Sequence, residues 1–159
     1  MIQNKQSSKP AYVTALEGAY GAPSQAGFGS SVFLEKLDPA VKLDEAALKK
    51  YKYFVGELWE RFGEEAWMSA WKQVYTRPVG AKHDIVAELK SVTDRDAQNS
   101  IPMILDVSNA KVSLSSAYDD PAVVELLVFN TGDGSAMSGV LMAGRRNNGE
   151  ATFLVFLYD

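Results

Sequence analysis

The sequence predicts an α+β protein in which helices pack on one face of a curved antiparallel sheet of about five strands. Two observations indicate this class. Residues 44–76 carry apolar side chains at three- and four-residue steps, which is the spacing of an amphipathic helix. Residues 122–159 hold three apolar runs separated by turn sequences, which is typical of a C-terminal three-stranded meander. Since the helical part precedes the strands, we expect one α+β domain over residues 11–159.

The N-terminal part is expected to hold little regular structure. Residues 1–10 are polar and should form a flexible tail. Residues 11–16 fit a short strand or a helical turn. Residues 18–31 contain four glycines and one proline, which predicts a long loop, and a loop of this length is usually functional or mobile. Residues 31–37 fit a strand.

Residues 44–76 should form the helical layer. Asp44 suits an N-cap, and Gly63 predicts a break. A second helix is then expected over residues 64–75, ending before Pro78. The apolar positions that define the first helix are Leu48, Tyr51, Val55, Leu58 and Phe62.

Aromatic side chains of this second predicted helix repeat every four residues, at Trp67, Trp71 and Tyr75. Residues four apart lie on the same side of a helix. Large aromatic side chains on one side of a helix usually belong to the core. The alternative is an aromatic-lined pocket or a partner-binding face, because Trp and Tyr are enriched at binding hot spots.

The middle of the chain has weaker patterns. Residues 84–92 fit a short helix, and residues 93–100 read as a polar loop. Residues 101–107 and 111–117 fit a hairpin whose second strand alternates polar and apolar side chains, as a strand with one wet face does.

The C-terminal strands are predicted over residues 122–130, 137–146 and 150–159. A two-residue type I′ turn at Asn148-Gly149 would place Gly144 opposite Phe153 and Gly139 opposite Tyr158. A ring packed over a glycine repairs a weak strand position, so both pairs favour this register.

These strands are apolar at consecutive positions, so the sheet should be apolar on both faces. Either both faces are buried within one domain, or one face is a homodimer interface or a pocket wall. The order of elements is similar to that of cystatin-like and nuclear-transport-factor-like rolls. The resemblance rests on element order alone, and it implies a pocket between helices and sheet but no activity.

Composition excludes several function classes. The net charge of −4 disfavours a nucleic-acid or anionic-membrane partner. The absence of cysteine rules out disulfides, thiol catalysis and thiolate metal sites. We expect a cytoplasmic protein without metal or cofactor, because the N-terminus lacks the apolar core of a signal peptide and no run is long enough to span a membrane.

Several single residues are candidates for chemistry. His83 precedes Asp84, and the two could form a general-base pair or be ordinary surface residues at a helix start. Asp106, Glu125 and Asp159 are carboxylates on or beside apolar strands, facing either a pocket or solvent. The Arg145-Arg146 pair would make the hairpin tip basic, so the tip either binds an anion or acidic partner or is simply solvated.

The function that fits best is a non-enzymatic protein-binding module, such as an inhibitor or immunity-type protein, an adaptor, or the subunit of a homodimer that associates through the sheet. The alternative is a small-molecule-binding or enzymatic roll. Its pocket would lie between helices and sheet, with Trp67, Trp71 and Tyr75 as walls and Glu125, Asp106 or His83 as acid–base groups. A third hypothesis is an exported effector with a mobile loop.

Overall fold

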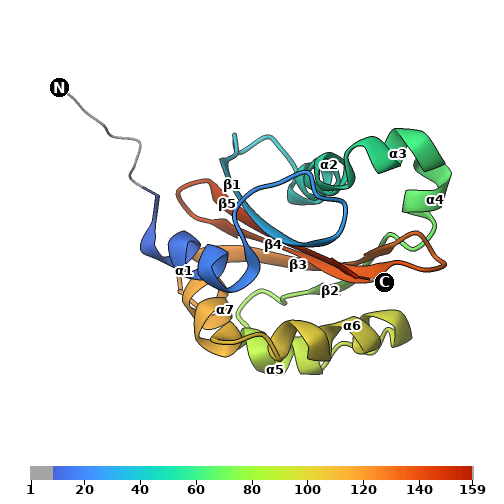
Figure 1. Ribbon diagram of the computed structural model, residues 1–159. Helices are drawn as coiled ribbons and strands as arrows, with labels where there is room; N and C mark the ends of the chain where they lie inside the picture. Colours follow the sequence, from blue (N-terminus) through green and yellow to red (C-terminus); the bar gives the residue numbers. More distant parts are fainter. Residues whose placement is uncertain (1–8, 159) are drawn as a thin grey trace.

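The computed structural model describes residues 9–158 and shows an open five-stranded antiparallel sheet between two layers of helices (Figure 1). The strand order is β1-β5-β4-β3-β2. The last three strands of the sequence therefore form a meander at the centre, with a strand from earlier in the chain on each side. The strands are β1 (Gly29–Lys36), β2 (Lys72–Thr76), β3 (Val123–Gly132), β4 (Ser138–Arg146) and β5 (Glu150–Tyr158).

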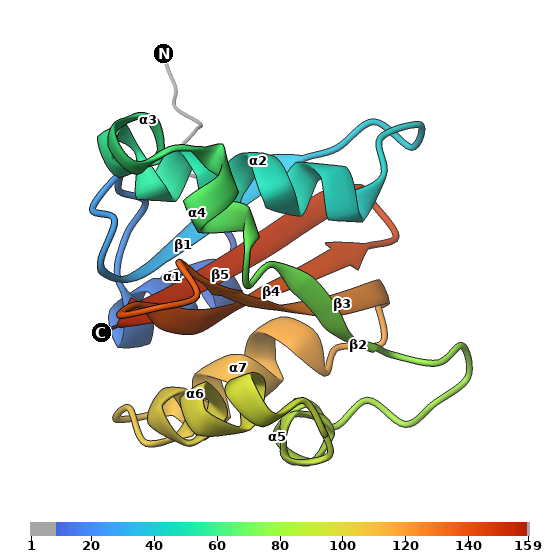
Figure 2. The same cartoon turned by 90° about the vertical axis from the view of Figure 1, so that its right-hand side faces the viewer.

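Helices cover both faces of this sheet (Figure 2). One face carries α2 (Leu43–Val55), α3 (Glu57–Phe62) and α4 (Glu64–Met68). The other carries α1 (Ala11–Tyr20), α5 (Ile85–Lys90), α6 (Arg95–Leu105) and α7 (Ala110–Tyr118). The predicted α+β class with its five-stranded antiparallel sheet and C-terminal meander is confirmed, but the helices form two layers where the sequence predicted one.

This arrangement explains why the strands are apolar at consecutive positions. On β3, Leu126 and Val128 pack in the core beneath α5, α6 and α7, whereas Leu127 and Phe129 pack in the core beneath α2 and α4. Successive side chains of a strand point to opposite faces, so a strand between two cores must be apolar throughout. Burial within the chain is therefore enough to explain the pattern, without a partner on either face.

The register of the last hairpin differs from the prediction by one residue. Gly144 pairs with Thr152 and Gly139 with Leu157, not with the aromatic residues expected. The turn is the reason. The Gly149 N–H donates to the Arg146 carbonyl at 2.9 Å, and Gly149 alone of the turn residues has a positive φ, at 93°. The connection is thus a three-residue loop with a bulge, and the type I′ turn expected at Asn148-Gly149 is wrong.

The hairpin predicted over residues 101–117 is also wrong, because this segment forms α6 and α7. Asp94 caps α6 by accepting the Ala97 N–H at 3.1 Å, so the helix begins within the predicted polar loop. Ala97, Ile101 and Ile104 then lie at helical spacing and are buried. In α7 the buried positions recur every three or four residues: Ala110, Ser113, Leu114, Ala117 and Tyr118.

The predicted helical layer is shorter and more broken than expected. Gly56, at a φ of 65°, separates α2 from α3, and α4 ends at Met68. The expected helix over residues 64–75 therefore fails in its second half, which forms the edge strand β2. The β-branched and aromatic residues of β2, Val74, Tyr75 and Thr76, suit a strand, and Tyr75 and Thr76 pair with β3 on one side of a bulge at Val74.

The N-terminal part is more regular than expected. Residues 11–20 form the helix α1, and the predicted strand over residues 31–37 is confirmed as β1. The predicted helix over residues 84–92 is confirmed as α5. The predicted tail lies mostly outside the described residues. No helix in the described part of the chain is long and apolar enough to cross a bilayer.

Candidate functional site

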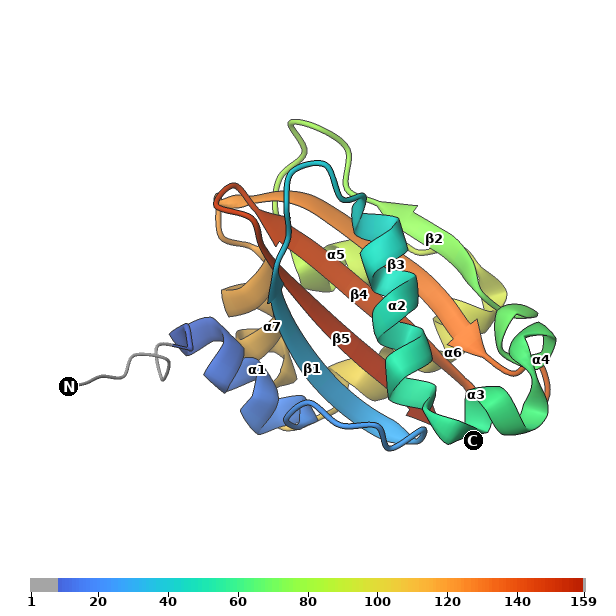
Figure 3. The same cartoon turned by 90° about the horizontal axis from the view of Figure 1, so that it is seen from above.

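Four connections meet at one end of the sheet, where β1, β2 and β4 end and β3 and β5 begin (Figure 3). They are residues 37–42, 77–84, 119–122 and 147–149. We call this surface the loop end. The connection over residues 77–84, between β2 and α5, extends beyond the edge of the sheet (Figure 2).

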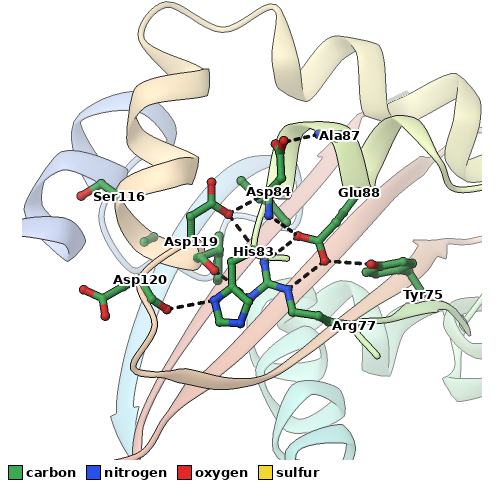
Figure 4. Close-up of polar contacts among 12 residues, drawn as sticks. Tyr75, Arg77, His83, Asp84, Ala87, Glu88, Ser116, Asp119 and Asp120 are labelled. Carbon is green, nitrogen blue, oxygen red and sulfur yellow. Dashed lines mark hydrogen bonds and ion pairs between the residues drawn. The ribbon is translucent and has the colours of Figure 1, made fainter. Parts of the chain in front are cut away.

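A buried ion pair fixes the base of this connection (Figure 4). Arg77 donates from Nε to Oε2 of Glu88 at 2.8 Å and from Nη2 to Oε1 at 2.6 Å. The Arg77 and Glu88 side chains are only 4% and 8% exposed, so this two-point contact is made out of water. Charge-assisted bonds of this kind are the strongest that side chains make.

The same two side chains tie together three elements. Nη1 of Arg77 donates to the Tyr118 carbonyl at the end of α7, at 2.9 Å. Tyr75 on β2 donates its hydroxyl to Oε2 of Glu88 at 2.7 Å, and the Asp84 N–H donates to Oε1 at 3.0 Å. Each Glu88 oxygen thus accepts two hydrogen bonds, so the charge of this carboxylate is fully compensated.

The return of the connection into α5 is fixed as well. Asp119 accepts the Ile85 N–H at 2.7 Å, and Asp84 caps α5 by accepting the Ala87 N–H at 3.3 Å. His83 lies with Nδ1 3.2 Å from the Asp120 carbonyl. The segment is therefore held at both ends, by Arg77 at its start and by His83 and Asp84 at its end (Figure 4).

The titration of the ion pair follows from this geometry. Burial would raise the pKa of Glu88, but the hydrogen bonds from Arg77 and Tyr75 and the charge of Arg77 outweigh it and hold this pKa below its ordinary value. Burial and the hydrogen bond to Glu88 raise the pKa of Tyr75 to about 12. At neutral pH Glu88 is thus ionised and holds Arg77, and Tyr75 is neutral and donates its hydroxyl to Glu88.

The tip of the connection is a tight turn with an apolar corner. The Ala81 N–H donates to the Pro78 carbonyl at 3.1 Å, and Gly80 has a φ of 83°, as a type II turn requires. Val79 occupies the corner and is fully exposed. An apolar side chain thus stands on a hydrogen-bonded turn whose two flanks are fixed.

Two hollows of about 450 and 420 Å³ lie at the loop end, and both include Pro39 and Arg145. Arg145 donates to the Val41 carbonyl and lies 3.8 Å from Glu125, from Nε to Oε1. The second hollow also includes Val124, which is 61% exposed. The loop end therefore carries two hollows lined by apolar, polar and charged groups, and no residue of the connection over residues 77–84 lines either of them.

The aromatic residues singled out in the sequence do not line a common site. Trp67 is buried on α4 and donates Nε1 to the Leu58 carbonyl at 2.9 Å. Trp71 follows α4 and stacks between Tyr51 and Phe129, with ring centroids 5.0 and 4.5 Å away. Tyr75 lies on β2 and packs with the core beneath α5, away from both tryptophans. The expectation of one stripe is wrong because β2 replaces the helix, whereas the reading of Trp67 as core fits.

The predicted carboxylates are also dispersed. Glu125 lies on β3 at the loop end with its side chain 42% exposed, and Asp106 lies after α6 on the rim of a different hollow. Asp159 lies outside the described residues. His83 and Asp84 are adjacent but make separate contacts, so the structure does not bring their side chains together as a general base and its partner.

Sequence reasoning missed Arg77, Glu88 and Val79. A signal for Glu88 was present, since it lies three residues after Ile85 and just before Leu89, on the buried face of α5. A carboxylate on a buried helix face requires a partner, and Arg77 is the arginine that precedes the helix. The run Pro78-Val79-Gly80 signals a turn, and turns lie on the surface, but nothing in the sequence shows that this turn is held in one conformation.

Within residues 9–158, no group of three or more His, Cys, Asp or Glu side chains is placed to hold a metal ion. No protein-family model matches the chain, and neither a curated protein nor a solved structure matches it significantly.

Proposed function

We propose that this chain is a protein-binding module that recognises its partner through the loop end, with the connection over residues 77–84 as the principal contact. The observation that carries the proposal is the contrast within this connection. Its flanks are fixed by the buried Arg77–Glu88 pair and by Asp119, while Val79 at its tip is fully exposed.

Binding energy depends on how much freedom is lost on association. A segment already held in one conformation loses less entropy on binding than a free loop does, so more of its contact energy appears as affinity. An inhibitor or immunity-type protein needs this property, because it must remain bound to one target. The hollows around Arg145, at the same end of the sheet, offer places for side chains of that target.

Other parts of the structure support a contact at this end more than a contact at the sheet faces. Helices of the same chain cover both faces. A homodimer, which is the other form of protein contact that we propose, would therefore use the loop end or a sheet edge. We place this binding function in the cytoplasm, in keeping with the lack of cysteine.

Site-specific photo-crosslinking tests the proposal. A photoreactive amino acid is placed at Val79 in the full-length chain, which is expressed in cells of its source. Val112, which is 75% exposed on α7, carries the same group in a matched control. We expect one discrete crosslinked protein at position 79 and none at position 112. Equal labelling at both positions, or none at 79, would overturn the proposal.

A second variant separates recognition from folding. Arg77→Met with Glu88→Met removes the ion pair that fixes the connection but replaces it by apolar side chains of similar length. In this background the crosslink at position 79 should weaken several-fold if the fixed conformation matters. A crosslink of unchanged yield would show that exposure of residue 79 alone is sufficient.

A further inference from the structure

We infer that a hollow between α5, α6 and the start of α7 binds a small ligand with an apolar body and a single carboxylate. The hollow has a volume of about 410 Å³ and shares no lining residue with the two hollows at the loop end. Its size lies within the range of small-molecule sites, which is about 300–1,000 Å³.

The floor of the hollow is apolar. Leu89 of α5, Val92 after it and Ile101 of α6 line the hollow, and their exposed fractions are 1%, 3% and 3%. Pro102 and Leu105 continue the same wall along α6. An apolar ligand body of about ten heavy atoms would gain from covering these groups.

The rim of the hollow is positively charged. Lys90 and Lys111 line it with one acidic residue, Asp106, which leaves a net charge of +1. Among residues 9–158, neither lysine forms an ion pair. The protein as a whole is acidic, with a net charge of −4, so a basic rim is a local exception. A ligand with one negative charge complements it.

Helix stability does not explain the place of Lys111. It lies in the first turn of α7, where a positive charge opposes the helix dipole, and this turn contains no acidic residue. Lys90 lies in the last turn of α5, where a cation is favoured. The position of Lys111 over the apolar hollow therefore calls for a reason outside its own helix, and an anionic ligand head supplies one.

Gln98 on α6 lies at the mouth of the hollow. Its carbonyl receives no helical hydrogen bond from Pro102, one turn later inside α6, because proline has no N–H. The Gln98 side chain donates to the Val92 carbonyl at 3.0 Å and so joins the two sides of the hollow. Gln98 is itself exposed, so a substitution there removes no core residue.

Titration of the ¹⁵N-labelled full-length protein with decanoate, followed by amide chemical shifts, tests the inference. We expect saturable shifts at Leu89, Ile101 and Leu105, and much weaker shifts with decanol, which lacks the charge. Lys90→Gln with Lys111→Gln should weaken decanoate binding roughly tenfold, whereas Lys49→Gln on the exposed side of α2 should leave it unchanged.

A variant that fills the hollow completes the test. Gln98→Trp places an indole over the floor, and we expect it to abolish the decanoate shifts while the protein remains folded. Shifts of equal size in Gln98→Trp and wild type would overturn the inference. So would shifts confined to other regions, equal binding of decanol and decanoate, or the absence of saturable shifts with decanoate.

Discussion

Arg77 and Glu88 form a two-point ion pair, 2.6 Å from Nη2 to Oε1, that closes the connection between β2 and α5 and removes both charges from water. The pair also reaches α7 through the Tyr118 carbonyl. One buried contact therefore fixes an edge strand, two helices and the segment that exposes Val79.

Loss of either charge should be more harmful than loss of both. Arg77→Met alone leaves Glu88 buried without its counter-charge, and Glu88→Met alone leaves Arg77 buried with only Asp119, 3.6 Å from Nη2 to Oδ1. We expect each to lower the free energy of unfolding by about 3–5 kcal/mol. The double variant should be more stable than either single variant, because it removes both buried charges and leaves only the partly exposed Asp119 without Arg77. Urea denaturation of the four proteins measures this coupling, and additive losses would contradict it.

The ion pair should also appear in the pH dependence of stability. The pKa of Glu88 is held below its ordinary value of 4.5, so its contribution to stability is present above pH 4.5 and is lost as the pH falls through the lower, folded-state pKa. Unfolding free energies from pH 7 to pH 3 should therefore fall more steeply for wild type than for the double methionine variant. Parallel curves would contradict this assignment.

Substitution by alanine at two glycines should change the stability of the protein in opposite directions. A Cβ on Gly139 would lie 1.7 Å from the Phe156 carbonyl oxygen, and both groups belong to paired backbone. We expect Gly139→Ala to cost about 3 kcal/mol or more. Gly18 lies within α1, and a Cβ there would meet no neighbouring side chain of the described residues within 4 Å, so Gly18→Ala should stabilise by about 0.5–1 kcal/mol. Thermal unfolding compares the two, and losses of similar size would contradict the register.

The Tyr51 hydroxyl should contribute more to the stability of the protein than the hydroxyl of its neighbour Tyr53. It accepts the Gly132 N–H at 3.0 Å and lies 3.1 Å from the carbonyls of Trp67 and Gly132, all of them buried. Tyr51→Phe leaves this N–H without a partner and should cost about 1–3 kcal/mol. Tyr53 is 51% exposed, and Tyr53→Phe should change stability by less than about 0.5 kcal/mol. Chemical denaturation would contradict the account if both variants lost the same amount.

An element could be predicted where its pattern lies within one short stretch of sequence, and it could not where it depends on distant segments. The three C-terminal strands could be predicted because their apolar runs are separated by turn sequences, a pattern that is typical of a strand meander. Their register was not, because it depends on whether Asn148 or only Gly149 takes a positive φ, and both turns suit the same residues. The order of strands was out of reach, since β1 and β2 are placed by pairing with distant segments.

Residues 101–117 show a second limit. Val112 and Leu114 alternate with polar residues, and this short pattern fits a strand as well as a helix. The decision rests on Asp94 as a cap and on the core beneath α7, which only the tertiary structure provides. The candidate site was harder to predict than these helices, because it depends on the contact between Arg77 and Glu88 and on the exposure of Val79.

We propose that Val79 and its fixed connection carry the affinity for a protein partner. Isothermal titration of the protein crosslinked at position 79 into wild type, Val79→Asp and Val112→Asp measures this affinity. We expect Val79→Asp to bind at least tenfold more weakly, because it puts a charge into an apolar contact, and Val112→Asp to bind as wild type does. Equal affinity of Val79→Asp and wild type would contradict the account.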